Sequence, residues 1–153
     1  MEEIIKGEIV SINTSEKKGG KKSPTSSAVI NNTGIKGDGH SGDWHRQISL
    51  LSAESIQKVK EAGIEVNPGD FAENLTISGL DFLKLDIGDR LEISDALGKK
   101  EVVLEVTQVG KECPKPCSIY YQMGSCIMPK EGIFTRVIKP GNVKVGDKII
   151  IGV

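Results

Sequence analysis

The sequence predicts a mostly β protein: a closed or nearly closed barrel of short strands with one or two peripheral helices. Its apolar residues fall in short runs, and many of its 18 glycines lie between those runs. Short apolar runs separated by glycine-rich turns are typical of strands joined by tight connections. About eight such runs stand against one clear helical pattern, which favours a barrel over a layered α/β fold.

The predicted strands follow one another along the whole chain, at residues 7–12, 28–30, 48–51, 74–77, 90–93, 102–109, 134–138 and 148–151. Ser52 is a suitable N-cap for a helix over about residues 53–62. Glu54 lies in the first turn of this helix and Gly63 just past its end. Ile56 and Val59 give the helix one apolar edge, so we expect it on the surface of the barrel.

Two segments of the chain repeat the same pattern. Residues 87–93 and 145–151 each consist of an apolar residue, a Gly-Asp turn, a basic residue and a strand. Two copies do not make a solenoid. They favour a barrel whose strands begin after similar tight turns.

Length and composition limit the possible functions. The 153 residues are the size of one domain, so we expect a single domain over 1–153. Aromatic residues make up 4% and the net charge is −1, which argue against nucleic-acid binding. No apolar run is long enough to span a membrane and no targeting signal is evident. We therefore expect a cytoplasmic protein with reduced cysteines.

A lysine-rich segment and a histidine-rich segment are candidate binding regions. Residues 15–27 carry four lysines around Gly19-Gly20, which predicts a mobile basic loop that could hold a small anion or simply be solvated. Both histidines, His40 and His45, lie within a glycine-rich stretch that also contains Asp38 and Arg46. Histidine there suggests ligand contact or acid–base chemistry, and arginine can bind a phosphate or carboxylate with two hydrogen bonds. A plain turn with exposed histidines is the alternative.

Three further polar residues, Asp70, Glu73 and Asn74, precede a predicted strand. Turn and capping roles explain them without any catalytic function.

All three cysteines lie in one segment between the strands that end at Val109 and begin at Phe134. Cys113 precedes a proline-started helical turn and has lysines at 111 and 115, a setting that favours the thiolate. A thiolate could bind a soft metal, carry a persulfide or act as a nucleophile, although a lone cysteine is most often a small buried side chain. The spacing to Cys117 and Cys126 does not match a zinc site, and packing or a resolving thiol explains them better.

Taken together and in this order, several motifs resemble the MOSC domain family, named for the C-terminal domain of molybdenum cofactor sulfurases. The motifs cover nearly the whole chain, at residues 17–22, 37–51, 69–75, 88–91, 110–113 and 124–134. The resemblance implies a β-barrel that binds molybdenum cofactor or handles sulfur destined for it. Cys113 matches the family cysteine proposed to carry a persulfide or ligate molybdenum. The cofactor contacts expected are Lys18, Lys22, His40, His45, Arg46 and Lys111.

The expected function is therefore molybdenum-cofactor binding or sulfur transfer during cofactor maturation or delivery, with Cys113 as the persulfide carrier or metal ligand. One alternative is a molybdoenzyme that reduces N-hydroxylated substrates, and another is a structural metal domain built on the cysteines. The expected partners are a sulfur donor such as a cysteine desulfurase, or an electron-donor reductase, and a target molybdoenzyme. Because no desulfurase region is present, we expect no pyridoxal phosphate in this chain.

Overall fold

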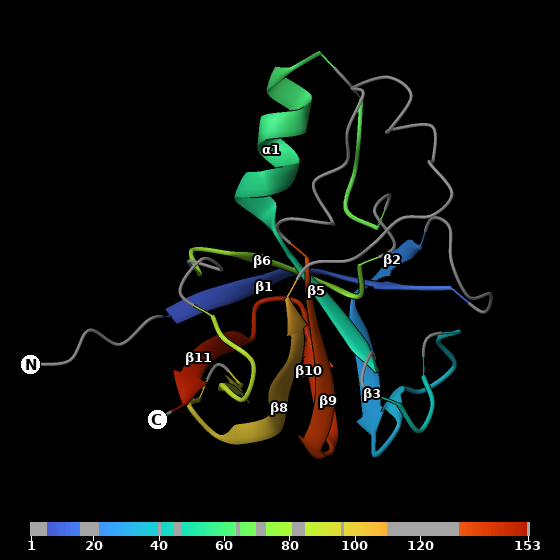
Figure 1. Cartoon of the computed structure of the whole chain (residues 1–153), viewed down its shortest axis with the longest axis vertical. Coiled ribbons are helices and arrows are strands. Elements are labelled where there is room, and N and C mark those ends of the chain that lie inside the picture. Colours follow the sequence, from blue (N-terminus) through green and yellow to red (C-terminus); the bar gives the residue numbers. More distant parts are fainter. Residues whose placement is uncertain are drawn as a thin grey trace, which may run out of the picture.

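The computed structural model describes residues 6–15, 22–39, 41–44, 47–63, 65–69, 73–80, 85–95, 97–109 and 132–152. These residues form a mostly β fold with a single short helix, as the sequence predicts (Figure 1). The elements are β1 (Lys6–Thr14), β2 (Ser23–Thr25), β3 (Ser27–Asn31), β4 (Gly34–Ile35), β5 (Ile48–Ser52), α1 (Ala53–Glu61), β6 (Leu75–Ser78), β7 (Arg90–Ser94), β8 (Lys100–Val109), β9 (Ile133–Lys139), β10 (Gly141–Lys144) and β11 (Lys148–Gly152).

Seven strands close into a barrel. They pair in the order β11, β7, β8, β9, β5, β6, β1, and the pairing of β1 with β11 closes the ring, with Gly7 opposite Ile149. Strands β5 and β6 pair in parallel, with Leu50 opposite Leu75. A parallel pair needs a crossover connection. Helix α1 lies on that connection and stands above one end of the barrel in Figure 1.

The barrel interior is filled by aliphatic side chains. Leu91 and Ile93 of β7 alternate with more exposed residues, as expected for strands with one buried face. The same cluster includes residues from every barrel strand, among them Ile9, Ile12, Leu50, Leu75, Ile77, Val102, Leu104, Val106, Ile133 and Ile149. The side chains of Ile9, Leu50 and Ile149 are fully buried. This aliphatic core is the main source of stability.

Helix α1 begins and ends as its sequence predicts. The Ser52 hydroxyl oxygen accepts a hydrogen bond from the Ser55 N–H at 3.2 Å, which caps the first turn. The helix ends before Gly63, which has φ of +91°. Ile56 and Val59 are buried, and they form the apolar edge that packs toward the barrel.

The first of the two repeated turns precedes β7. The Gly88 N–H donates to the Val106 carbonyl at 2.8 Å, and the Val106 N–H donates to the Asp89 carbonyl at 2.8 Å. The Asp89 carboxylate closes the turn, because its Oδ2 accepts from the Asp86 N–H at 2.9 Å.

The second repeated turn precedes β11 and uses the same contacts. The Gly146 N–H donates to the Ile9 carbonyl at 2.8 Å, and the Ile9 N–H donates to the Asp147 carbonyl at 2.9 Å. The Asp147 Oδ2 accepts from the Lys144 N–H at 2.9 Å. The strands that follow these turns, β7 and β11, are antiparallel neighbours in the barrel. The repeat in the sequence is therefore a repeat in the structure.

Three short strands were not predicted. The expectation of a loop over 15–27 is wrong for Ser23–Thr25, which pairs with β1 as β2. Strands β4 and β10 pair with β3 in a separate three-stranded sheet. All three are short, and β2 is exposed throughout, so none has the apolar alternation that marks a strand in sequence. Among the described residues, no helix is long and apolar enough to cross a bilayer.

Candidate functional site

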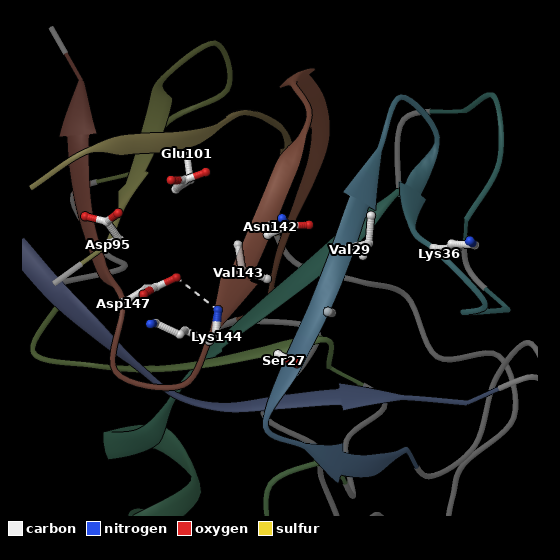
Figure 2. Close-up of a pocket in the computed structure, with 10 residues that line it drawn as sticks. Ser27, Val29, Lys36, Asp95, Glu101, Asn142, Val143, Lys144 and Asp147 are labelled. Atoms are coloured by element: carbon white, nitrogen blue, oxygen red, sulfur yellow. Dashed lines mark hydrogen bonds between the residues drawn. The ribbon is translucent and has the colours of Figure 1, made fainter. Parts of the chain in front are cut away.

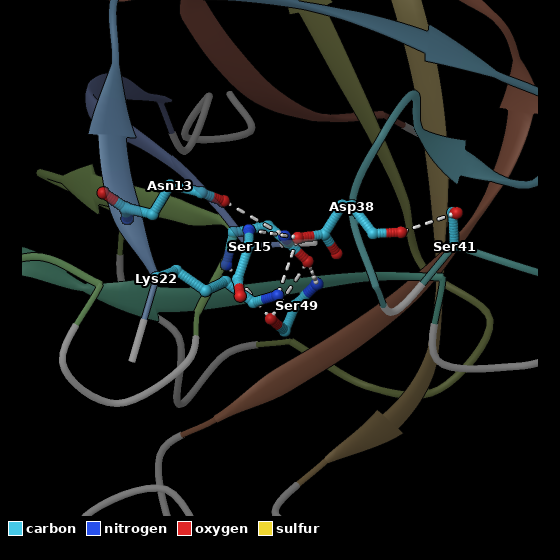
Figure 3. Close-up of polar contacts among 7 residues, drawn as sticks. Asn13, Ser15, Lys22, Asp38, Ser41 and Ser49 are labelled. Carbon is cyan, nitrogen blue, oxygen red and sulfur yellow. Dashed lines mark hydrogen bonds and ion pairs between the residues drawn. The ribbon is translucent and has the colours of Figure 1, made fainter. Parts of the chain in front are cut away.

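A buried ion pair lies between the lysine-rich and histidine-rich segments. The Lys22 Nζ lies 2.7 Å from the Asp38 Oδ1, and each residue is 4% exposed (Figure 3). Removing two charges from water is costly, so such a pair persists only where its geometry and additional hydrogen bonds compensate. The Asp38 carboxylate accepts such an additional hydrogen bond from the backbone of Ser15, which precedes residues 16–21.

Asp38 joins three parts of the chain. Its Oδ1 also accepts from the Ser15 N–H at 3.0 Å, and the Ser15 carbonyl accepts from the Gly39 N–H at 2.7 Å. The Asp38 carbonyl accepts from the Ser41 hydroxyl at 2.7 Å. Ser15 and Lys22 are the described residues on either side of 16–21. The Asp38 carboxylate therefore binds the residues on both sides of 16–21, and the backbone carbonyls of Ser15 and Asp38 bind the two neighbours of position 40.

The network continues to a third loop through Gly69. The Lys22 N–H donates to the Gly69 carbonyl at 2.8 Å, and the Gly69 N–H donates to the Glu73 Oε1 at 3.0 Å. The other oxygen of Glu73 accepts from the Thr76 hydroxyl at 2.9 Å. Glu73 is fully buried. It therefore joins Gly69 to Thr76, which fits the turn role that the sequence suggested, and connects these residues to Lys22 through Gly69.

Two buried asparagines fasten the strands beneath these loops. The Ser49 N–H donates to the Asn74 Oδ1 at 3.0 Å, and the Asn74 Nδ2 donates to the Asn13 carbonyl at 3.2 Å. The Asn13 Nδ2 donates to the Thr76 hydroxyl at 3.1 Å. These side chains connect β1, β5 and β6 through bonds additional to the sheet ladder. We refer to Asn13, Ser15, Lys22, Asp38, Ser49, Gly69, Glu73, Asn74 and Thr76 as the polar network.

The strand register relates this network to the cysteine-bearing segment. Val109 pairs with Ile133, Ile133 with Leu50, Leu50 with Leu75, and Leu75 with Ile12. This row crosses the barrel wall from the two residues that flank 110–132 to β1, the strand that carries Asn13 of the polar network. Neighbouring strands lie about 4.8 Å apart, so the four steps span roughly 19 Å.

The structure describes one of the predicted site residues, Lys22. Its ammonium group is paired with Asp38 inside the protein, whereas the sequence suggested a mobile loop lysine facing an anion. The remaining candidates lie outside the described residues, namely Lys18, His40, His45, Arg46, Lys111 and Cys113. Within the described residues, no group of three histidine, cysteine or acidic side chains is arranged to hold a metal ion.

Sequence reasoning did not identify which buried partners Asp38, Glu73 and Asn74 have. Polar residues beside glycine-rich turns are common, and their spacing gives no sign that they meet in space. The signal that could have found them is their chemistry. Asp, Glu and Asn residues next to predicted strands need hydrogen-bond partners when the fold buries them.

These features define a small β-barrel protein whose connecting loops are anchored on a buried polar network beside the barrel. The family model of the MOSC domain matches residues 37–150, and the chain belongs to this family. The MOSC domain family is associated with molybdenum-cofactor-related function. The matched range includes Asp38, Glu73 and Asn74 as well as all three cysteines, whereas the lysine-rich segment precedes it.

Solved structures with the same fold include the YuaD protein from Bacillus subtilis, with a TM-score of 0.78 and 20% identity over 99% of this chain and 98% of that chain. YiiM from Geobacillus stearothermophilus has a TM-score of 0.67 and 21% identity over 96% of this chain and 75% of that chain. YiiM from Escherichia coli has a TM-score of 0.64 and 19% identity over 100% and 71%. At these identities the likeness concerns the fold. No curated protein gives a significant match.

Proposed function

We propose that this protein binds molybdenum cofactor, or carries sulfur destined for it, during cofactor maturation or delivery. In this proposal Cys113 bears the sulfur or ligates the metal. The observation that carries the proposal is the convergence on Asp38. Its carboxylate binds Ser15 and Lys22, and the carbonyls of Ser15 and Asp38 accept hydrogen bonds from the residues on either side of His40. The lysine segment and the histidine segment are two of the segments expected to contact the cofactor.

The described residues of the polar network are suited to positioning the loops rather than to contacting the cofactor directly. Lys22 is neutralised by Asp38 and the Glu73 oxygens accept bonds from Gly69 and Thr76, so the network holds loop ends in place. Phosphate binding would then depend on Lys18 and Arg46, because lysine offers a point charge and arginine a two-pronged donor. Bound cofactor would supply a metal centre able to exchange oxygen or sulfur. The protein would hold its anionic part and present a thiolate.

The cysteine segment is long enough to reach this region. It lies between Val109 and Ile133, which are paired in the row of residues that crosses to β1. An extended chain advances about 3.3 Å per residue, so even a folded segment of this length could cover roughly 19 Å. The lysine at position 111 would favour the thiolate form of Cys113.

The first experiment compares wild type with Cys113→Ser, both purified from cells that synthesise molybdenum cofactor. Metal analysis, pterin fluorescence and intact mass are measured on each protein. We expect molybdenum and pterin, or one added sulfur atom, on wild type and their loss from the variant. Cys117→Ser is the matched control, expected to load as wild type does. Normal loading of Cys113→Ser with an intact fold would contradict the role of this cysteine.

The same preparation separates the carrier from the molybdoenzyme alternative. Wild type loaded with molybdenum is supplied with a reductant and an N-hydroxylated compound. A carrier is expected to show no turnover. Sustained turnover that requires Cys113 would replace the carrier function with a reductase function.

A further inference from the structure

A groove of about 650 Å³ lies beside β10 and shares no residue with the polar network. It lies between β3, the hairpin of β7 and β8, and the turn that joins β10 to β11 (Figure 2). Its walls combine apolar residues with three carboxylates, Asp95, Glu101 and Asp147. An acidic cluster alone does not define a binding site. The burial and the hydrogen-bond partners of each carboxylate therefore decide what the groove can bind.

Asp147 has a buried oxygen that lacks a partner. The residue is 1% exposed, and its Oδ2 accepts from the Lys144 N–H at 2.9 Å. Its Oδ1 is buried and receives no hydrogen bond from the described residues. A buried acceptor without a donor costs free energy, and a charged one costs more than a neutral one. A donor brought by a ligand would recover that cost.

The repeated turn shows that this oxygen is not needed to form the turn. Asp89 occupies the equivalent position before β7 and closes its turn with one oxygen, as Asp147 does. Asp89 is only partly buried, whereas Asp147 is 1% exposed. The same turn at position 147 leaves the second oxygen buried and unbonded among the described residues, in a side chain that lines the groove. The two turns therefore differ in the burial of this carboxylate and in its place beside the groove.

The other two carboxylates lie at the same end of the groove. Figure 2 shows Asp95 and Glu101 grouped with Asp147, while Lys36 lies well apart beyond β3. The Asp95 Oδ1 accepts from the N–H groups of Leu97 and Lys99, each at 2.9 Å, so this carboxylate is held in place. Glu101 is half-buried. Three acids against the exposed Lys144 give this end of the groove an excess of negative charge.

The arrangement suits an organic cation better than a metal ion. Within the described part of the chain, no three acidic, histidine or cysteine side chains are close enough to share a metal. The groove is also far larger than a bare ion requires, and Ala28 and Val143 line it with apolar surface. We propose that this groove binds an alkylammonium or guanidinium group, with Asp147 and Glu101 facing the charge and the apolar wall contacting the methylene stem.

The test is a titration of the full chain with agmatine and with cadaverine at constant ionic strength, followed by isothermal calorimetry and amide chemical shifts. We expect saturable binding, with shifts centred on residues 141–147. Asp147→Asn keeps an oxygen that can accept from the Lys144 N–H but replaces the unpartnered oxygen, and we expect it to weaken binding about tenfold or more. Asp89→Asn is the matched control and is expected to bind as wild type does.

Several results would overturn the proposal. They are the absence of saturable binding, equal affinity in wild type and Asp147→Asn, or a preference for Ca²⁺ over both amines. If Asp147→Asn does not fold, Glu101→Gln takes its place, and unchanged affinity in that variant would reject the site.

A parallel titration with N-acetyl-lysine amide distinguishes two sources of the cation. Tighter binding of the free amines indicates a small metabolite, and tighter binding of the amide indicates a lysine side chain of a protein. Because the groove shares no residue with the polar network, failure here leaves the proposed cofactor function untouched.

Discussion

The pair of Lys22 and Asp38 shows how one residue contact can organise several loops. A buried charge is tolerated because it is paired, and loss of one partner leaves the other charge in a site that cannot solvate it. Asp38 is also bonded to the Ser15 N–H, so its carboxylate connects the two ends of the lysine segment. We expect the stability of the chain to depend strongly on this single contact.

Lys22→Met should lower the free energy of unfolding by about 3 kcal/mol, because it leaves the Asp38 carboxylate buried and unpaired. Urea unfolding followed by circular dichroism measures the change. Lys148→Met is the matched control, since its partner Glu8 and its own side chain are both more than one third exposed. The control should cost less than about 1 kcal/mol. Equal losses in the two variants would show that burial of the Lys22 pair has no special importance.

Glu54 is expected to make stability depend on pH. Burial alone would raise the pKa of its carboxyl group, but hydrogen bonds from the Gly79 N–H, from its own N–H and from the Ser52 hydroxyl lower it overall. A lowered pKa in the folded state stabilises the protein above the ordinary carboxyl range, and this contribution is lost as the pH falls through and below roughly 4–5. Urea unfolding of Glu54→Gln across this range should show a weaker acid dependence than wild type. An unchanged pH profile would contradict the role of Glu54.

At the scale of elements, the turns require particular backbone shapes. Gly69 has φ of +94°, and a Cβ atom there would lie 2.2 Å from the Lys22 carbonyl oxygen. Gly63, which follows α1, has φ of +91° with nothing within 4 Å of a Cβ. The two glycines therefore share a backbone conformation but differ in the space around them.

This difference gives a controlled test. Gly63→Ala should cost about 1 kcal/mol, the strain of a left-handed backbone. Gly69→Ala should cost clearly more, because the Lys22 carbonyl must move away and this movement disturbs the hydrogen bond from the Lys22 N–H to the Gly69 carbonyl. Thermal unfolding of both variants measures the difference. Equal costs would mean that the contact between Gly69 and Lys22 relaxes without loss.

At the scale of the whole molecule, barrel closure depends on β1 pairing with β11. The repeated turn before β11 adds two hydrogen bonds between β1 and the chain at Gly146 and Asp147, so closure and turn formation support each other. Ile149, at the centre of this contact, is fully buried. We refer to the pairing of β1 with β11 as the seam. The seam is therefore expected to unfold together with the rest of the core rather than separately.

Ile149→Ala should reduce the free energy of unfolding by about 3 kcal/mol, since it removes buried aliphatic atoms and leaves a cavity. Val145→Ala, four residues earlier and 43% exposed, should cost less than about 1 kcal/mol. Amide hydrogen exchange adds a second readout, because a seam that opens by itself would release the amides of β1 and β11 before those of β8 and β9. Such early release in wild type would contradict a cooperative barrel.

The sequence by itself determined the fold class, the strands with apolar alternation and the limits of α1. These features follow from local patterns: the spacing of Ile and Leu, the cap at Ser52 and the glycine at position 63. The repeated Gly-Asp turns were also visible in sequence, because their conformation is specified within a few residues. The resemblance of several motifs pointed to the MOSC domain family, which the family match established.

Only the tertiary structure decided which polar residues meet. Lys22 and Asp38 are separated by 16 positions, and Asn13 and Asn74 by 61. No local sequence pattern indicates such contacts. The sequence around Lys22 therefore predicts a solvated loop, although Lys22 is buried against Asp38. The same reason explains the groove beside β10, where Asp95 and Glu101 of the β7–β8 hairpin lie with Asp147 of the turn before β11. Local spacing specifies strands and turns, whereas closure of the barrel determines which charges lose their water and need a partner.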